Sequence, residues 1–322
     1  MPYTHKKVNL NGCQQDILIL AQNTDNPVLL IVHGGPGSPD RPLVLKYNDK
    51  LQEYYTVVCW DQRGAGFSYC RDRLTIDLML ADMKALVKYL IKEFHQDQIY
   101  IAGHSWGAYL GLRFSALYPQ YVKYYVGTGQ GVSSQVDEIE KYTFVKEQAE
   151  KRNDEKVLEK LILFGVPSGY NYPNEAEKAI AFVGKMVQKY GGYIHPNNNF
   201  SMKSYLGLYF NHYKKDIWKV LKGINYSVKC LNPEINSTDE ISCITELHVP
   251  VLLISGEQDY VCPVTTTQKW FDTLKAPAKT FVKIKNAAHM VNFEQSDAWN
   301  KLIIDIRDNG ERARGIKRFL RF

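Results

Sequence analysis

The sequence lacks the features that mark membrane, secreted and nucleic-acid-binding proteins. Its longest apolar runs, such as Val28–Val32 and Val249–Ile254, are far too short to span a bilayer. The opening residues MPYTHKKVNLNG contain no apolar stretch of the kind found in secretory signals. No dense Lys/Arg run with interleaved aromatic residues occurs, and the net charge of +6 is modest, so nucleic acid is not an expected partner. We therefore expect a cytoplasmic protein without stable membrane association.

The six cysteines follow no pattern used for metal binding or redox catalysis. None belongs to a CxxC pair, and no group of histidines accompanies them at a spacing that would complete a metal site. We expect reduced thiols that lie partly in the core. These residues are Cys13, Cys59, Cys70, Cys230, Cys243 and Cys262.

The composition and the patterning predict an α/β protein. The 322 residues are 45% hydrophobic and 23% charged, which is typical of a globular chain long enough for one large domain. The continuous apolar run Val28–Val32 predicts a buried strand, and Leu78–Phe94 has the spacing of an amphipathic helix. Gln98–Ala102 and Trp106–Leu117 repeat this order of strand and helix. Such alternation predicts a mostly parallel central sheet flanked by helices.

The pattern changes after Gly131 and changes back near residue 247. The intervening segment is rich in Lys and Glu, and its helical stretches are Asp137–Arg152, Glu155–Leu163 and Glu175–Tyr190. Strand-like segments return at Val249–Ser255 and Thr280–Ile284. We therefore predict that residues 1–131 and 247–322 form the core, and that residues 132–246 form a helical cap inserted in it.

The most informative motif is Gly103-His104-Ser105-Trp106-Gly107, a G-x-S-x-G pentapeptide. It lies between a predicted strand and a predicted helix, the context in which this motif presents a serine nucleophile on a sharp turn. Glycines two residues to either side remove Cβ atoms that would collide in so tight a turn. The helix N-terminus adds free N–H groups for a developing anion. Ser105 is therefore the expected nucleophile.

A serine nucleophile needs a base and an acid that orients the base. Asp259 follows the strand Val249–Ser255, and His289 follows the strand Thr280–Ile284. Both are expected on loops at the carboxyl ends of their strands, where α/β sheets place active sites. We expect His289 to accept the proton of Ser105 and Asp259 to fix the tautomer of His289.

A glycine-rich segment, His33-Gly34-Gly35-Pro36-Gly37, follows the strand Val28–Val32. A loop at this position supplies backbone amides for the oxyanion of a tetrahedral intermediate. We expect the backbone N–H of Trp106 and one from Gly34 or Gly35 to hold that oxygen.

Together, HGGPG at residues 33–37, DQRG at residues 61–64 and GHSWG at residues 103–107 resemble the proline iminopeptidase family of α/β-hydrolase fold serine hydrolases. The resemblance covers the core better than the cap. It implies Ser105, Asp259 and His289 as the catalytic triad and no metal or organic cofactor. We interpret DQRG as support for the oxyanion loop, with Arg63 in a buried structural ion pair rather than a catalytic one.

The resemblance also implies removal of an N-terminal residue, often proline, from a peptide whose free α-amine is held by carboxylates of the cap. Glu294, five residues after His289, is a further candidate for binding the amine. The cap carboxylates include Asp137, Glu138, Glu140, Glu147, Glu234, Asp239 and Glu240. The cap aromatic residues, which either line an apolar pocket or pack the cap on itself, include Tyr142, Phe144, Tyr205, Tyr209, Phe210 and Trp218.

Three hypotheses about function follow. The first is a serine aminopeptidase that releases proline or a small apolar residue from short peptides. The second keeps the triad but takes an ester, lactone or amide without a free amine. The third, a ligand-binding protein on a hydrolase scaffold, is disfavoured because nucleophile, base, acid and oxyanion elements are all present. The oligomeric state is not predicted, and the basic segment at residues 312–321 is either a solvated tail or a contact with an anionic membrane.

Overall fold

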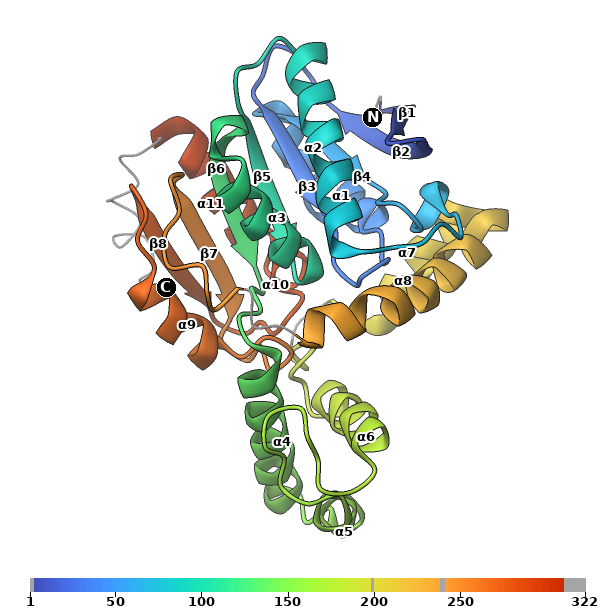
Figure 1. Ribbon diagram of the computed structural model, residues 1–322, viewed down its shortest axis with the longest axis vertical. Coiled ribbons are helices and arrows are strands. Elements are labelled where there is room, and N and C mark those ends of the chain that lie inside the picture. The colour runs from blue at the N-terminus through green and yellow to red at the C-terminus, as the bar shows by residue number, and fades with distance from the viewer. Residues whose placement is uncertain (1–2, 198–199, 238–240, 310–322) are drawn as a thin grey trace.

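The computed structural model describes residues 3–197, 200–237 and 241–309. Its strands are β1 (Tyr3–Leu10), β2 (Cys13–Leu20), β3 (Val28–Val32), β4 (Thr56–Trp60), β5 (Ile99–His104), β6 (Val122–Thr128), β7 (Val251–Gly256) and β8 (Lys279–Ile284). They form one sheet in the order β1-β2-β4-β3-β5-β6-β7-β8 (Figure 1). The β1–β2 and β2–β4 pairs are antiparallel and the remaining pairs are parallel. The predicted mostly parallel sheet is confirmed.

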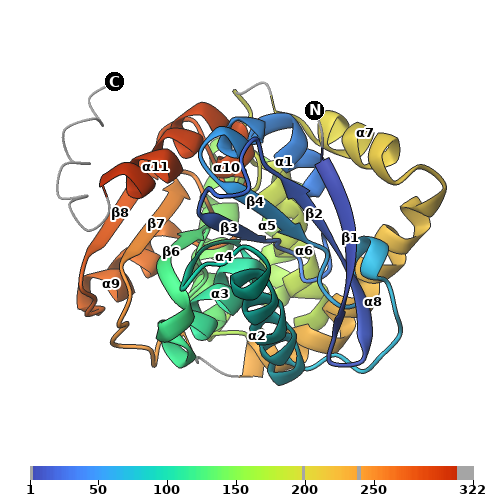
Figure 2. The ribbon, with the colours of Figure 1, turned by 90° about the horizontal axis from the view of Figure 1, so that it is seen from above.

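Helices cover both faces of this sheet (Figure 2). The core helices are α1 (Arg41–Tyr47), α2 (Ile76–Glu93), α3 (Trp106–Leu117), α9 (Val264–Thr273), α10 (Val291–Glu294) and α11 (Ser296–Asn309). On one face α2, α3 and α9 bury residues such as Leu110 and Phe271, and on the other α1 and α11 bury Leu43 and Ile303. Burial of both faces explains why the central strands are continuously apolar.

Between β6 and β7 the chain forms a set of cap helices. They are α4 (Ser134–Lys151), α5 (Glu155–Phe164), α6 (Ala176–Lys189), α7 (Met202–Tyr213) and α8 (Ile217–Ser237). The first three stand away from the sheet in Figure 1 and share a separate hydrophobic cluster that includes Val145, Leu161 and Val183. In contrast, α7 packs on α1, and α8 packs on α2 and the short 3-10 helix η2 (Gly66–Ser68). The cap therefore contacts the core chiefly through α7 and α8.

Three further 3-10 helices are η1 (Asp49–Glu53), η3 (Pro119–Tyr121) and η4 (Lys214–Asp216). In the described ranges, no helix has the length and apolar character that a bilayer crossing requires. The basic segment at residues 312–321 lies outside the described residues.

Candidate active site

Ser105 occupies the sharp turn between β5 and α3. Its backbone has φ 54° and ψ −117°, a left-handed conformation that costs free energy in a residue with a Cβ. The turn is tight enough that a Cβ on Gly107 would collide with the carbonyl oxygen of Val32. The backbone N–H of Ser105 donates to the carbonyl oxygen of Thr128 at 2.9 Å, which fixes the turn against β6. This is the geometry that the G-x-S-x-G motif predicts.

Asp259 and His289 meet at the carboxyl ends of β7 and β8. Nδ1 of His289 lies 2.9 Å from Oδ2 of Asp259, and both side chains are buried. The other carboxylate oxygen, Oδ1, accepts the backbone N–H groups of Val261 and Cys262 at 2.9 Å each. One carboxylate oxygen therefore accepts Nδ1–H of the imidazole, while the other fixes the carboxylate to its own loop. Ser105 and His289 line the same cavity, so the structure brings the three predicted triad residues into one site.

Glu294 lies beneath the His289 loop. Its Oε1 accepts the backbone N–H groups of Ala288 and Met290 at 3.1 and 3.0 Å, and its Oε2 accepts the N–H of His195 at 2.7 Å. Three backbone donors therefore already surround this carboxylate, and two of them flank His289. The geometry gives Glu294 a positioning role, and its binding of a substrate amine stays a prediction.

His104, which was not among the predicted site residues, also supports this loop. Its Nε2 donates to the carbonyl oxygen of His289 at 3.0 Å. Burial lowers the pKa of His104 to about 3, with the neighbouring His289 acting in the same direction, so the ring is neutral. Its place inside the G-x-S-x-G motif was the available signal.

The expected oxyanion donors lie beside Ser105. A Cβ on Gly34 would lie 3.2 Å from the Cβ of Ser105, so the glycine loop approaches the nucleophile closely. Trp106 is the first residue of α3, so its N–H has no partner within the helix. Gly35 and Trp106 both line the cavity in front of Ser105.

Gln62 of the DQRG segment joins the two sides of this oxyanion site. Its Nε2 donates to the carbonyl oxygen of His33 at 2.9 Å, and its Oε1 accepts Nε1–H of Trp106 at 2.8 Å. The backbone N–H of Gln62 donates to Nε2 of His33 at 3.2 Å, and Nδ1 of His33 donates to the carbonyl oxygen of Gly34 at 2.8 Å. DQRG therefore supports the glycine loop, as its sequence indicated.

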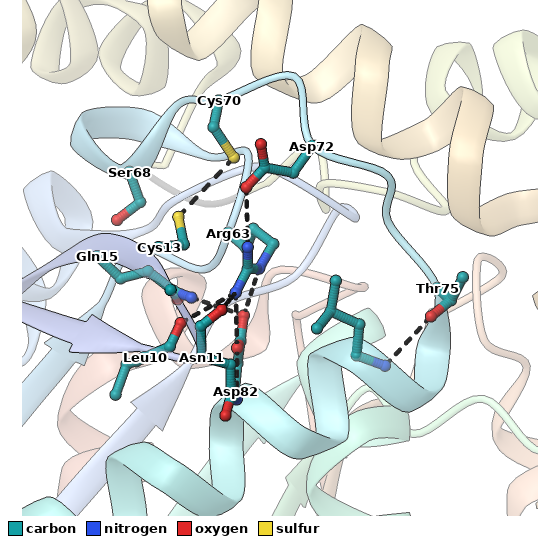
Figure 3. Close-up of polar contacts among 12 residues, drawn as sticks. Leu10, Asn11, Cys13, Gln15, Arg63, Ser68, Cys70, Asp72, Thr75 and Asp82 are labelled. Atoms are coloured by element: carbon teal, nitrogen blue, oxygen red, sulfur yellow. Dashed lines mark hydrogen bonds and ion pairs between the residues drawn. The ribbon is translucent and has the colours of Figure 1, made fainter.

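Arg63 makes the buried ion pair that was predicted for it (Figure 3). Its Nε and Nη2 donate to the carboxylate of Asp82 at 2.6 and 3.0 Å, and its Nη1 donates to Asp72 at 2.9 Å. Cys13 and Cys70 lie beside this network with their Sγ atoms 4.0 Å apart. The two thiols and Asp72 could offer three ligand atoms to a metal, and Oδ2 of that carboxylate already accepts Nη1–H of Arg63.

Within the described residues, Ser105 lines a cavity on its cap side and another on its His289 side. The cap cavity, about 260 Å³, lies between the core and helices α4 and α8. Its lining includes Trp106, Val132, Asp137, Lys141, Ile235 and Ile241. The aromatic cavity, about 140 Å³, lies on the His289 side. Its lining includes Asp40, Tyr193, Tyr205, Tyr209, His289 and Phe293.

Of the cap carboxylates named above, Asp137 lines the cap cavity. It is 5% exposed, and within the described part of the chain its Oδ1 has no hydrogen-bond partner. Glu138 instead accepts the hydroxyl of Tyr172, Glu140 contacts Thr265, and Glu234 accepts the N–H of Ile76. Glu147 is exposed, while Asp239 and Glu240 lie outside the described residues.

Of the cap aromatic residues named above, some line a cavity, some pack within the cap and some are exposed. Tyr205 and Tyr209 line the aromatic cavity. Tyr142 and Phe144 pack within the cluster of α4, α5 and α6. Phe210 and Trp218 are exposed.

The chain is similar over most of its length to proteins with aminopeptidase names. A protein of Bacillus subtilis strain 168 named "Probable aminopeptidase YbaC" is 29% identical over 297 residues, covering 90% of this chain and 92% of that protein. The proline iminopeptidase of Thermoplasma volcanium is 23% identical over 302 residues, covering 92% of this chain and 94% of that enzyme.

Solved structures share the fold. A proline iminopeptidase-related protein of Thermus thermophilus superposes with a TM-score of 0.66 at 15% identity, covering 95% of this chain and 97% of that one. A serine hydrolase involved in carbazole degradation gives a TM-score of 0.64 at 17% identity, covering 94% and 98%. The family model described as "alpha/beta hydrolase fold" matches residues 27–296. With this match, the sheet order and the serine turn after β5, the chain belongs to the α/β-hydrolase fold family.

Proposed function

We propose that this protein is a serine aminopeptidase that releases a small apolar residue or proline from the N-terminus of short peptides. The observation that carries the proposal is the buried carboxyl of Asp137 in the cap cavity beside Ser105, with an oxygen that has no partner in the described structure. A substrate α-ammonium is the group that such a carboxylate would bind most strongly. The name of the Bacillus subtilis relative agrees with this assignment.

The charges around Asp137 favour a cation in the cap cavity. Nζ of Lys141 lies 3.7 Å from Oε2 of Glu138, and the same ammonium group interacts electrostatically with Asp137. One ammonium group therefore serves two carboxyl groups. A bound α-ammonium would restore the balance of charge. The apolar side chains of Val132, Ile235 and Ile241 would then surround a small apolar first residue.

In the proposed mechanism, Ser105 Oγ attacks the carbonyl carbon of the first peptide bond while His289 accepts its proton. The backbone amides of Trp106 and of Gly34 or Gly35 hold the resulting oxyanion. The intermediate collapses when His289 returns the proton to the leaving amine, and water then hydrolyses the acyl-enzyme by the same steps.

The position of His289 indicates which cavity takes the leaving group and which takes the acyl group. His289 lines the aromatic cavity and must reach the nitrogen that leaves, so the leaving group belongs on that side. The acyl group, with its free amine, belongs in the cap cavity with Asp137.

The alternative is an esterase or amidase whose substrate has no free amine. One observation favours it: burial raises the pKa of Asp137 to about 7, with the Lys141 charge opposing, so the carboxyl is partly neutral at physiological pH. A neutral carboxyl does not require a cationic substrate.

Asp137→Asn separates the two candidates. For an aminopeptidase, the variant loses about 30-fold or more in kcat/KM on alanyl-amide substrates but little on aryl esters, because the ammonium would lose its charged partner. Glu147→Gln, an exposed acid on the same helix, is the matched control and leaves both activities unchanged. Equal effects of Asp137→Asn on amides and esters would favour the esterase.

A further inference from the structure

The aromatic cavity contains a buried carboxyl of its own. Asp40 is 6% exposed and lines this cavity together with Ser105 and His289. Its Oδ2 has no hydrogen-bond partner in the ranges that the structure describes. A buried carboxyl oxygen without a donor is costly unless a ligand supplies one.

Helix capping does not account for Asp40. The residue is the N-cap of α1, yet its side chain makes no capping hydrogen bond. Pro42, the second helical residue, has no N–H to offer. The N–H groups of Leu43 and Val44 donate to the backbone carbonyl of Asp40, at 2.9 and 3.0 Å, and not to its carboxyl. The carboxyl interacts with its own backbone N–H, and its Oδ2 stays available to a group bound in the cavity.

The charges near Asp40 favour a cation. Arg41, the next residue, is fully buried, and its guanidinium already binds Asp61 at 2.8 Å and Asp16 at 2.7 Å. His33, in the adjoining glycine loop, adds no charge because burial lowers its pKa to about 4. One guanidinium thus faces three carboxyl groups when Asp40 is ionised.

The walls of the cavity also suit a cation. Tyr193, Tyr205, Tyr209 and Phe293 surround the space, and the faces of aromatic rings attract cations. The Tyr205 hydroxyl lies 3.0 Å from Oγ of Ser38, which ties α7 to the oxyanion loop and fixes this wall. A carboxyl with one unpartnered oxygen suits the compact ammonium group of a lysine, whereas a planar guanidinium is matched by a carboxylate that accepts two parallel hydrogen bonds.

We propose that the aromatic cavity is a cation subsite, in which Asp40 binds the side-chain ammonium of a lysine that follows the scissile bond. The inference rests on the proposed function, because the leaving group of an aminopeptidase begins with the second residue. It makes the enzyme selective at two positions: Asp137 for the free amine of the first residue and Asp40 for the ammonium of the second.

The test compares alanyl-lysine with alanyl-norleucine, which lacks only the ammonium nitrogen. The wild-type enzyme is expected to favour alanyl-lysine by about tenfold or more in kcat/KM, and Asp40→Asn to reduce this ratio to about one. Asp25→Asn, which removes an exposed carboxylate far from the site, keeps the ratio. A wild-type ratio near one, or an Asp40→Asn variant that loses both substrates equally, would overturn the proposal.

A second pair of substrates separates this inference from the peptidase assignment. Butyrate esters of 5-aminopentanol and of 1-hexanol place an ammonium or a methyl group at the same distance on the leaving side. If neither dipeptide is cleaved but the esters are, the peptidase assignment fails, and the ester ratio with Asp40→Asn still decides the subsite. Equal ester rates in the wild type would reject it.

If Asp40→Asn does not fold, inhibition of the wild-type enzyme gives the decision. Pentylammonium is expected to inhibit ester hydrolysis competitively, with an inhibition constant about tenfold or more below that of 1-pentanol. Equal inhibition constants would contradict a cation subsite.

Discussion

The indole Nε1 of Trp106 donates a 2.8 Å hydrogen bond to Oε1 of Gln62. Trp106 carries one expected oxyanion N–H, and the same Gln62 side chain also binds the carbonyl oxygen of His33, next to the other expected donor, Gly34. One amide side chain therefore bridges the two loops that, in the proposed mechanism, hold a single oxygen. Rigid placement of such donors is a large part of the catalytic power of serine hydrolases.

Gln62→Ala is accordingly expected to lower kcat by about 10- to 100-fold on amide and ester substrates alike, with little change in KM, because the donors lose their alignment. Steady-state kinetics measure this effect. Gln22→Ala, at an exposed site, serves as the control. An unchanged kcat in Gln62→Ala would mean that the oxyanion loops need no such link.

Glu294→Gln tests the positioning role of Glu294. The substituted amide keeps one acceptor oxygen, but it turns an N–H₂ group toward backbone donors. We expect the free energy of unfolding to fall by about 1–3 kcal/mol and kcat to fall on all substrates. The preference for free over N-acylated amines should stay as it is. Loss of that preference alone would instead make Glu294 the ligand of the substrate amine.

The pH dependence of selectivity tests Asp137. Its pKa is raised to about 7 by burial, so the carboxylate that binds an ammonium forms as the pH rises through that value. The ratio of kcat/KM for alanyl-amides over aryl esters should therefore increase from about pH 5.5 to about 7.5, then fall as the substrate amine, with a pKa of about 8, loses its proton. Because both reactions use His289, any change in its protonation affects the two rates equally and leaves their ratio unchanged. In Asp137→Asn the ratio should be flat over the rising limb; an unchanged rise there would exclude Asp137 as its cause.

The same two buried carboxyls predict how stability varies with pH. Burial raises the pKa of Asp40 and of Asp137 from 3.8 to about 7 in the folded state. Between about pH 4 and 7 the unfolded chain therefore binds fewer protons than the folded one, and each group lowers the free energy of unfolding as the pH rises, by on the order of a few kcal/mol. Urea unfolding at about pH 4.5 and 7.5 should show a smaller loss in an Asp40→Asn, Asp137→Asn double variant than in the wild type. Identical losses would contradict the burial argument.

Local patterning predicted the central elements of the fold. Val28–Val32 and Trp106–Leu117 have the bounds that the apolar run and the helical spacing indicated, because each buries a regular face. β1 was not predicted, since an edge strand pairs on one side only and its sequence is largely polar. α8 was missed because it contains Gly223 and Pro233, and its packing against η2 and α2 outweighs these weak helix formers.

In the site, too, some residues were predicted from local motifs and one was not. Motifs at strand ends predicted that Ser105, Asp259 and His289 lie close together, because the carboxyl ends of parallel strands share one edge of the sheet. Asp40 was not found, since an aspartate directly before a helix has the pattern of an ordinary N-cap. Asp40 and Tyr209 line the same cavity because α7 packs on α1, and no local sequence pattern encodes that packing.

The most direct test of the central claim, a serine aminopeptidase, measures hydrolysis of prolyl- and alanyl-amide fluorogenic substrates, their N-acetylated forms and short aryl esters by wild-type protein and Ser105→Ala. We expect turnover of the free-amine amides, loss of that turnover on N-acetylation, and a fall of about 10³-fold or more in a folded Ser105→Ala variant. Retained activity in Ser105→Ala, or turnover of the esters alone, would contradict it.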